Sequence, residues 1–394
     1  MPPLQLSHYT LCSSLGNGVQ AHTAALLAER SGLRPVDFAG IDLQTWAGRV
    51  AGIEDVRLPD ELEVFNCRNN QLAQLALATD DFRQHVQAAI ARYGANRVGL
   101  FLGTSTSGVQ QGELAYAARD QNDGVLPEGF HYNTTQAIFS LGDFVRRSLG
   151  LQGPAEVIST ACSSSAKVFA VADRFINAGF CDAAVVGGVD SLCQLTLYGF
   201  NSLQLVSSKP CRPADQSRDG LSIGEAAGFA LLERGDAADG IGLLGYGESS
   251  DAWHMSTPNP DGSGAAIAMR QALERAGLSA GDIDYINLHG TATPANDLAE
   301  DAALVNVFNG ETPCSSTKGY TGHTLGAAGI VEALISCLAI DNGVAFRSLN
   351  TTHVDSAIKS PVLLEALRQP LERVMSNSFG FGGSNAALIF GRLS

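Results

Sequence analysis

The chain has 394 residues, 45% hydrophobic and 16% charged, which is enough apolar material for a sizeable core in two domains or one large duplicated fold. Its formal net charge of −15 argues against a general nucleic-acid-binding protein. No run approaches 18 apolar residues, and the start lacks the charged and apolar zones of a signal peptide. We therefore expect a soluble, cytoplasmic protein with neither nucleic acid nor membrane as a partner.

Strand-like runs recur along the chain and alternate with helix-like segments. In chain order the strand-like runs are 98–103, 155–159, 183–189, 228–233, 283–288 and 386–390. Helical spacing of apolar residues occurs in 72–94, after Cys162 and in 264–278. Near-continuous apolar strands between helices indicate an α/β fold whose sheets are covered on both faces.

One passage, "ERGDAADGIGLLGYG" at 233–247, is polar and rich in glycine and aspartate. Such composition makes it the best internal boundary. We predict an N-terminal half at 1–237 and a C-terminal half at 238–394, although no direct repetition between them is visible in the sequence.

Eight cysteines are present, without a CxxC pair or a paired pattern of metal ligands. They are Cys12, Cys67, Cys162, Cys181, Cys193, Cys211, Cys314 and Cys337. A disulfide framework is uncommon in a chain this large and rich in core residues. We expect no metal site and no disulfide framework.

Cys162 occupies a position that favours reactivity. It follows the strand-like run 155–159 and precedes a helix-like segment that Gly179 would end. A thiol at a helix start lies at the positive end of the helix dipole, which lowers its pKa and favours the thiolate without a strong general base. Position alone leaves a second interpretation open, because most free cysteines are small buried core residues.

Polar, glycine-rich stretches follow strand-like runs in the second half, where α/β proteins place chemistry. They are 287–294, 315–329 and 376–385. His289 and His323 lie in such turns, and either one alone would more often be a structural hydrogen bonder. With Cys162 they form a set suited to acyl transfer, in which the thiol takes the acyl group and the imidazoles donate hydrogen bonds or move protons.

Four motifs together resemble those of the β-ketoacyl-acyl carrier protein synthases, which are condensing enzymes of the thiolase superfamily. The motifs are "TACSSSAK", "NLHGTATPANDLAE", "KGYTGHTLGAAG" and "SNSFGFGGSN", within a similarity that covers about 95 to 390. The resemblance implies a thiolase-type fold, a five-layered αβαβα sandwich of two similar βαβαβαββ halves. It also implies decarboxylative Claisen condensation of malonyl-acyl carrier protein with an acyl group, in fatty acid or polyene/polyketide-type elongation.

The resemblance assigns catalytic roles to matching positions. Cys162 matches the nucleophile that holds the acyl group as a thioester, and His289 and His323 match the paired histidines of the decarboxylative step. Lys318 matches the active-site lysine, and Glu300 matches the acidic residue of the supporting network.

The resemblance also implies how the substrate is bound. The backbone N–H groups of Cys162 and Phe381 match the oxyanion hole. Thr291 and Thr293 match the threonines that hydrogen-bond the phosphopantetheine arm, and Phe379 and Phe381 fall in the loop that gates the acyl pocket. No cofactor is implied, because the phosphopantetheine arrives on the acyl carrier protein.

Partners follow from the same resemblance. The family docks its acidic carrier protein through basic residues, for which Arg68, Lys209 and Arg212 are the candidates. It assembles as a homodimer or as a heterodimer with a chain-length-factor-like homologue.

The chain departs from the family pattern at "GTSTSG" (103–108), where most members have a "GSGIGG"-like turn. Thr106 then takes the position that gates the acyl pocket, which predicts a changed pocket shape. The stretch "FNCRNNQLAQLAL" (65–77) is similar to synthases of aryl polyene pigment clusters, which makes that branch a narrower prediction.

Three other functions compete with a synthase. A non-catalytic, chain-length-factor-like subunit would typically lack the nucleophile that Cys162 supplies. A thiolase would use a Cys-His-Cys arrangement with free coenzyme A, which the two-histidine pattern disfavours. A binding module would leave the polar, glycine-rich loops unexplained.

Overall fold

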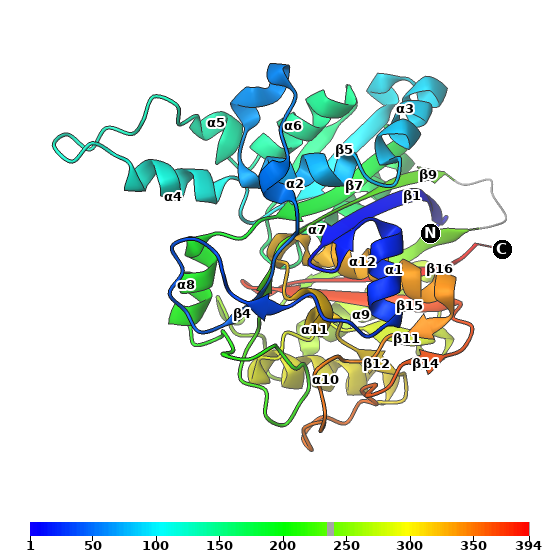
Figure 1. Ribbon diagram of the computed structural model, residues 1–394. Helices are drawn as coiled ribbons and strands as arrows, with labels where there is room; N and C mark the ends of the chain where they lie inside the picture. Colours follow the sequence, from blue (N-terminus) through cyan, green and yellow to red (C-terminus); the bar gives the residue numbers. More distant parts are fainter. Residues whose placement is uncertain (235–239, 394) are drawn as a thin grey trace.

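The structure is a computed structural model that describes residues 1–234 and 240–393 (Figure 1). Its main sheet contains eleven strands, of which ten lie in the order β12-β11-β15-β16-β10-β1-β9-β7-β5-β6, while the short β2 (Gly16–Asn17) pairs with β1 outside this order. The first five of these ten along the chain are β1 (Leu4–Ser13), β5 (Val98–Gly103), β6 (Ala155–Ile158), β7 (Ala183–Asp190) and β9 (Ala226–Arg234). The other five are β10 (Ile241–Ser250), β11 (Tyr285–Asn287), β12 (Cys314–Ser315), β15 (Arg373–Gly380) and β16 (Ser384–Arg392).

The ten strands in this order form two five-stranded parts with one topology. Numbered by their order in the chain, the strands β6-β5-β7-β9-β1 run 3-2-4-5-1, and so do β12-β11-β15-β16-β10. In both parts the second strand pairs in parallel with the third and fourth, and the fifth pairs antiparallel with its neighbours. The parts join where Leu4 of β1 pairs with Leu243 of β10.

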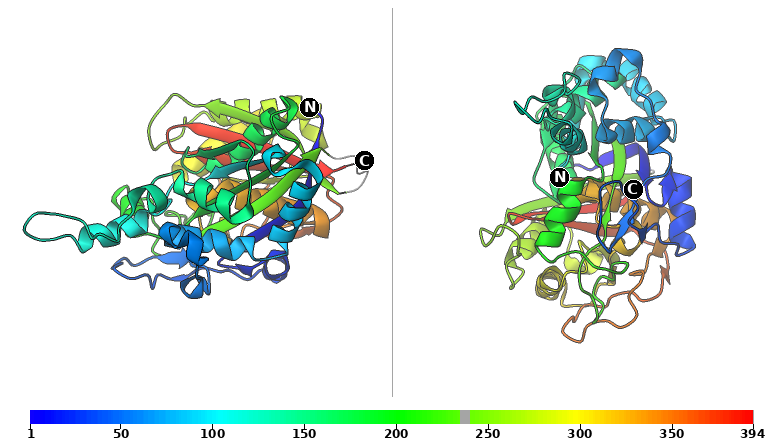
Figure 2. Two further views of the ribbon diagram at one scale, coloured as in Figure 1. Left: turned by 90° about the horizontal axis from the view of Figure 1, so that it is seen from above. Right: turned by 60° about the vertical axis from the view of Figure 1, so that its left-hand side comes forward.

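Helices cover both faces of each part and so complete five layers. The central layer is α7 (Ser164–Asn177) and α12 (Ala328–Asn342), which pack on each other and on strands of both parts. The outer layers are α2 (Arg68–Leu77), α3 (Phe82–Tyr93) and α6 (Ser140–Leu149) on one side, and α9 (Ser263–Ala276) and α10 (Pro294–Phe308) on the other. The αβαβα thiolase-type sandwich is therefore confirmed (Figures 1 and 2).

The central helix α12 is apolar on every side because protein surrounds it. By length and composition the stretch Leu325–Asn342 could cross a membrane, with a mean hydropathy of 1.5, but 89% of it is buried inside the protein. Glu332 is buried in this helix, although its neighbours along the chain are apolar.

The single helix predicted at 72–94 is wrong, because the segment forms two helices, α2 and α3. Asp80 and Asp81 between them have φ values of +52° and +53°, in the left-handed region that an α-helix cannot include. The Asp80 carboxylate accepts hydrogen bonds from the Thr10 hydroxyl, at 2.9 Å, and from the Val19 N–H, at 3.1 Å. This corner therefore attaches the outer helices to the N-terminal segment.

The boundary predicted between 237 and 238 lies outside the described residues. Much of the surrounding passage is strand rather than linker, since β9 ends at Arg234 and β10 begins at Ile241. Glycines make β10 look like a loop in the sequence, but they allow α9 to approach it. A Cβ on Gly247 would lie 1.8 Å from the carbonyl oxygen of Ala268.

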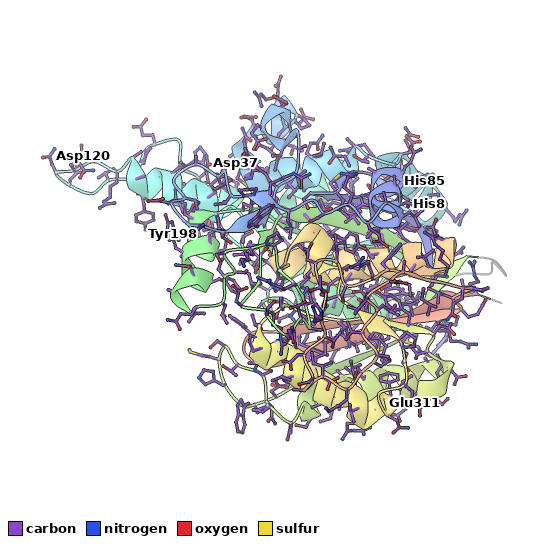
Figure 3. The ribbon with its side chains drawn as sticks, turned by 60° about the horizontal axis from the view of Figure 1, so that its bottom comes forward. His8, Asp37, His85, Asp120, Tyr198 and Glu311 are labelled. Atoms are coloured by element: carbon purple, nitrogen blue, oxygen red, sulfur yellow. The ribbon has the colours of Figure 1, made fainter. Side chains whose placement is uncertain are left out.

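One segment extends away from the layers. It runs between α4 (Val109–Ala117) and α5 (Tyr132–Thr135), and Asp120 lies near its tip (Figures 1, 2 and 3). Leu114 and Tyr116 on α4 are exposed, as is Tyr132 on α5.

Candidate active site

Cys162 lies in a sharp turn between β6 and α7. Ala161 before it has a φ of +52°, a left-handed conformation that is unfavourable for a residue with a Cβ and that often occurs at functional sites. Hydroxyl groups hold the turn: Ser163 donates to the Thr160 carbonyl, and Ser164 donates to the Ala161 carbonyl and accepts the Thr160 N–H. The helix-start position predicted for Cys162 is confirmed, and its side chain is buried.

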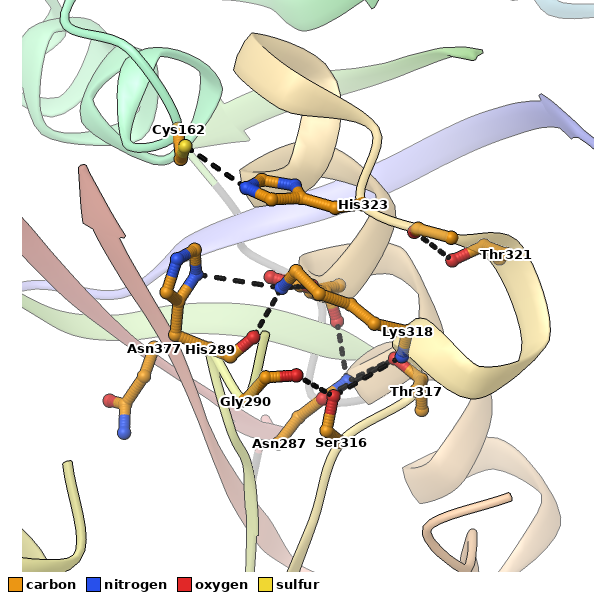
Figure 4. A network of polar contacts seen from close by, with 12 residues as sticks. Cys162, Asn287, His289, Gly290, Ser316, Thr317, Lys318, Thr321, His323 and Asn377 are labelled. Atoms are coloured by element: carbon orange, nitrogen blue, oxygen red, sulfur yellow. Dashed lines mark hydrogen bonds and ion pairs between the residues drawn. The ribbon is translucent and has the colours of Figure 1, made fainter. Parts of the chain in front are cut away.

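His323 lies directly against Cys162, with Nε2 3.0 Å from Sγ (Figure 4). The backbone N–H of Leu325 donates to Nδ1 of the same ring over 3.2 Å. Because Nδ1 accepts that hydrogen bond, the neutral imidazole carries its hydrogen on Nε2. Nε2–H is therefore a donor that points at the cysteine sulfur.

His289 reaches the same space from the loop after β11. Lys318 Nζ lies 3.4 Å from its Nδ1 and also donates to its backbone carbonyl (Figure 4). An ammonium group only donates hydrogen bonds, so Nδ1 accepts and the hydrogen of this ring too lies on Nε2. The two rings are perpendicular, with centroids 5.4 Å apart.

Sequence reasoning missed the partner that holds Lys318 in place. Glu332, on α12, accepts a hydrogen bond from Nζ, and both side chains are buried. An acidic residue between apolar residues in the first half of the helix is the signal that could have identified it. Burial raises the pKa of Glu332 to about 7, and the adjacent ammonium opposes that shift.

Glu300 supports the backbone of the His289 turn rather than Lys318. Its carboxylate accepts the N–H groups of His289, at 2.9 Å, and Gly290, at 2.8 Å, and the side-chain amide of Asn377 at 3.2 Å. Burial raises the pKa of Glu300 to about 7, against the effect of these donors.

Burial dominates the electrostatics of the reacting groups. It raises the pKa of the Cys162 thiol to about 12, opposed by the charge of Lys318 and by the N–H of Phe381. The lowered pKa expected at a helix start is therefore wrong for this site. Burial, and then the charge of Lys318, lower the pKa of both His289 and His323 well below the ordinary value, so both rings are neutral near pH 7.

The same three side chains lie close enough together to contact one metal ion. One ligand atom each from Cys162, His289 and His323 lie within 4.8 Å of one another. A metal binds the lone pair of a ring nitrogen, but the nitrogens facing this cluster carry hydrogens. Donors already occupy Nδ1 of both rings, so the arrangement fits hydrogen-bond donation and not metal binding.

The loop after β15 closes over the cysteine turn. A Cβ on Gly380 would lie 2.7 Å from the Thr160 carbonyl oxygen, so this approach requires glycine. The N–H of Phe381 donates toward Cys162. Its ring lies 5.4 Å from that of Phe200, and the Phe379 ring lies 5.9 Å from that of His289.

A cavity connects these groups to the surface. Its lining brings together the predicted residues Cys162, His289, Thr291, Thr293, His323, Phe379 and Phe381. The hydroxyls of Thr291 and Thr293 are 2.8 Å apart, and Ala292 between them has a φ of +65°. The buried reacting groups lie at its inner end, while exposed lining residues such as His254 and Ala295 surround its opening.

Thr106 does not line that cavity. Its hydroxyl donates to the buried carboxylate of Asp190 over 2.8 Å, as does that of Thr104 over 2.7 Å. Asp190 also accepts the backbone N–H of Gly326, three residues beyond His323. This carboxylate was not predicted, and it ties the "GTSTSG" turn to the His323 turn.

The three basic docking candidates differ in burial and in their ion pairs. Arg68 is wrong as a docking residue, because it is buried and its guanidinium donates to Glu225 and Glu54. Arg212 is half-buried and lies 3.7 Å from a carboxylate oxygen of Asp219. Lys209 is exposed.

Comparison with known proteins gives matches over most of the chain. The family model described as β-ketoacyl synthase, N-terminal domain, matches residues 12–238, and the model described as β-ketoacyl synthase, C-terminal domain, matches residues 242–352. The chain is 32% identical over 414 residues to 3-oxoacyl-[acyl-carrier-protein] synthase 2 of Vibrio cholerae, covering 97% of both chains. It is 42% identical over 267 residues to the mitochondrial 3-oxoacyl-[acyl-carrier-protein] synthase of Arabidopsis thaliana, covering 62% of this chain and 58% of the relative.

Solved structures are similar along the whole chain. A chain in the complex of the ketosynthase ApeO with its chain length factor ApeC from Xenorhabdus doucetiae superposes with a TM-score of 0.90 at 37% identity, covering 99% of this chain and 98% of that one. The β-ketoacyl synthase from Burkholderia phymatum STM815 superposes with a TM-score of 0.89 at 30% identity, covering 100% of both chains.

Proposed function

This chain belongs to the β-ketoacyl synthase family, and we propose that Cys162, His289 and His323 carry out its reaction. It is an acyltransferase, a 3-oxoacyl-[acyl-carrier-protein] synthase, which performs decarboxylative condensation in fatty acid or polyketide-type chain elongation. One observation carries the assignment of roles. Nε2 of His323 lies 3.0 Å from Cys162 Sγ, and His289 faces the same cavity with its hydrogen also on Nε2.

In the first half-reaction Cys162 takes the acyl group. Sγ attacks the acyl carbonyl carbon, a new S–C bond forms, and the bond from that carbon to the sulfur of the carrier's arm breaks. The proton of the thiol leaves with the released arm. Nε2–H of His323 and N–H of Phe381 both point at Sγ and stabilise its negative charge, which burial alone disfavours.

In the second half-reaction the malonyl unit decarboxylates. Its C–C bond to the carboxylate breaks, CO₂ leaves, and the electron pair forms an enolate whose oxygen accepts Nε2–H from His289 and His323. The enolate carbon attacks the acyl carbonyl carbon on Cys162. The oxygen of that carbonyl accepts hydrogen bonds from the backbone N–H groups of Cys162 and Phe381. The bond to Sγ then breaks, which leaves Cys162 as a thiolate and a β-ketoacyl group on the carrier. A proton taken up from water restores the thiol.

The carrier's phosphopantetheine arm enters as part of the substrate, so the reaction requires no resident cofactor. Thr291 and Thr293 support this proposal, because both hydroxyls lie in the cavity wall on the way to Cys162. Assignment to the aryl polyene branch stays a prediction.

A second chain of the same fold completes the enzyme, as a homodimer or with a chain-length-factor-like homologue. The ketosynthase ApeO is solved in complex with its chain length factor. In this chain β6 is the last strand on its side of the sheet, and α4, which leads into the segment around Asp120, carries exposed Leu114 and Tyr116. Sedimentation of the purified chain with and without such a homologue decides between the two assemblies.

Mass spectrometry of Cys162 tests the proposed function. The protein is incubated with a panel of acyl-carrier-protein thioesters and digested, and the mass of the peptide containing Cys162 is measured. An acyl adduct on this residue, absent in Cys162→Ala, is expected. An adduct on another cysteine, or none with any member of the panel, would refute the assigned nucleophile.

A further inference from the structure

The opening of the active-site cavity carries exposed apolar side chains. Residues of three segments supply its outer lining, 200–205, 251–258 and 293–296. Each segment contains, or is followed within two residues by, a large exposed apolar residue that does not itself line the cavity. These residues, which we call the apolar rim, are Leu203 (50% exposed), Trp253 (61%), Met255 (77%) and Leu298 (39%).

The loop that bears Trp253 and Met255 is held against the active site. The N–H of Gly382 donates to the Met255 carbonyl over 2.8 Å, and the N–H of Asp251 donates to the Gly383 carbonyl over 2.8 Å. Asp251 also accepts the side-chain amide of Asn385 at 2.6 Å. The loop is therefore bonded to the turn that carries Phe381, although two of its largest side chains are left uncovered.

The segments that supply the outer lining carry no positively charged lysine or arginine. None of 200–205, 251–258 and 293–296 contains either residue, and one of them contains aspartate, Asp251. Of the basic candidates nearby in sequence, Arg212 already faces Asp219, which leaves Lys209. A chain with a formal net charge of −15 therefore offers little positive charge to an acidic partner at this point.

We propose that the carrier protein docks on the apolar rim by burying an apolar surface around the attachment point of its arm. The inference rests on the proposed function, because that function requires a carrier whose arm enters this opening. Large exposed apolar side chains near the opening of a binding cavity are typical of interaction surfaces. Large residues such as tryptophan and methionine are enriched where protein interfaces are most strongly bound.

The test compares carrier-bound malonyl with a malonyl thioester of free pantetheine, which carries no protein. For Trp253→Ala/Met255→Ala we expect KM for the carrier-bound substrate to rise about tenfold or more, a loss of the order of one interface anchor. Turnover of the pantetheine thioester and the melting temperature stay unchanged. Trp253→Phe retains most of the affinity. Phe180→Ala, which removes an aromatic side chain that is 62% exposed and absent from the cavity lining, is the matched control and leaves both substrates unaffected.

Salt concentration separates apolar docking from docking by charge. If the rim binds the carrier, KM changes less than about twofold when ionic strength rises from 0.05 to 0.5 M, because screening weakens only charged contacts. An unchanged KM in Trp253→Ala/Met255→Ala overturns the proposal, as does a steep salt dependence that Lys209→Glu abolishes. Failure of the wild-type protein to turn over either substrate would instead refute the proposed function.

Discussion

Lys318 donates a hydrogen bond to Glu332 inside the active site, where the two side chains are only 1% and 3% exposed. The same ammonium group contacts Nδ1 and the backbone carbonyl of His289. This ion pair therefore fixes which nitrogen of His289 carries the hydrogen, although neither charge touches Cys162 by a hydrogen bond.

Glu332→Gln should lower both stability and decarboxylation. Leaving one charge of a buried pair without its partner costs about 3–5 kcal/mol of unfolding free energy. Loss of an oriented donor slows a reaction by about 10²-fold or more. Lys318→Met/Glu332→Leu removes both charges, so it should recover stability but not release of CO₂ from malonyl-carrier protein. Full CO₂ release by this double variant would show that Lys318 has no positioning role.

Cys162→Ala should abolish condensation, because Cys162 supplies the one thiol in the cavity lining among the residues that the structure describes. Cys162→Gln should keep decarboxylation of malonyl-carrier protein, since its amide carbonyl resembles that of an acylated cysteine and leaves both imidazoles in place. Product analysis by mass spectrometry and measurement of CO₂ release check the two variants. Condensation that persists in the alanine variant would contradict the mechanism.

His289→Ala and His323→Ala should differ in the first half-reaction. Each removes a donor to the enolate oxygen and should slow decarboxylation by about 10²- to 10³-fold. Only His323 lies against Sγ, so His323→Ala should also slow acylation of Cys162, whereas His289→Ala should acylate at the normal rate. Rapid-quench mass spectrometry of the acyl-enzyme gives both rates. Equal acylation rates in the two variants would show that the 3.0 Å contact has no part in forming the thioester.

Asp190→Asn should disturb the His323 turn from a distance. The carboxylate accepts hydrogen bonds from Thr104, Ser105, Thr106 and Gly326. In the asparagine variant the side-chain NH₂ group is itself a donor, so it cannot accept the hydrogen bonds of the groups that it faces. An unsatisfied buried group costs about 1–3 kcal/mol. We expect kcat to fall more than KM rises, because Gly326 follows the residue that orients His323. A lowered melting temperature with unchanged kcat would limit Asp190 to a structural role.

The stability of the protein should fall in mild acid because of His22. This buried imidazole contacts the Gly18 carbonyl and the Ser13 hydroxyl, and burial lowers its pKa to about 4. The unfolded chain binds a proton at this residue below about pH 6.5, whereas the folded chain does so near pH 4. The contribution of His22 to the free energy of unfolding is therefore complete above pH 6.5 and falls by about 3 kcal/mol as the pH drops to 4. His22→Gln should flatten this part of the urea-denaturation profile, and an unchanged slope would contradict the assignment.

The reacting residues could be predicted from the sequence because each lies in a short motif with a local cause. Cys162 follows a strand and starts a helix, and His289 and His323 occupy glycine-flanked turns. The direction of the pKa shift of Cys162 could not be predicted in the same way. The position of Cys162 favours a lowered pKa, but burial by residues far along the chain raises it.

Residues whose role depends on distant partners were missed or misjudged. Arg68 looks like a surface cation in its own segment, yet its partner Glu225 is 157 residues away. Asp190 ends a strand, and only the fold brings it against Gly326. The strand β10 was likewise misjudged. Its glycines allow α9 to pack closely against it, and a glycine-rich sequence alone does not show whether its glycines serve close packing or a turn.

The repeated strand order has a consequence for ancestry. Cys162 follows the third strand of the first part and precedes α7, whereas His323 follows the third strand of the second part and precedes α12. The nucleophile and its imidazole thus occupy corresponding places in the two parts. An ancestor built from two identical subunits would have carried the same side chain at both places. In such an ancestry, thiol and imidazole could diverge only once the two copies were encoded separately or joined in one gene and could mutate independently.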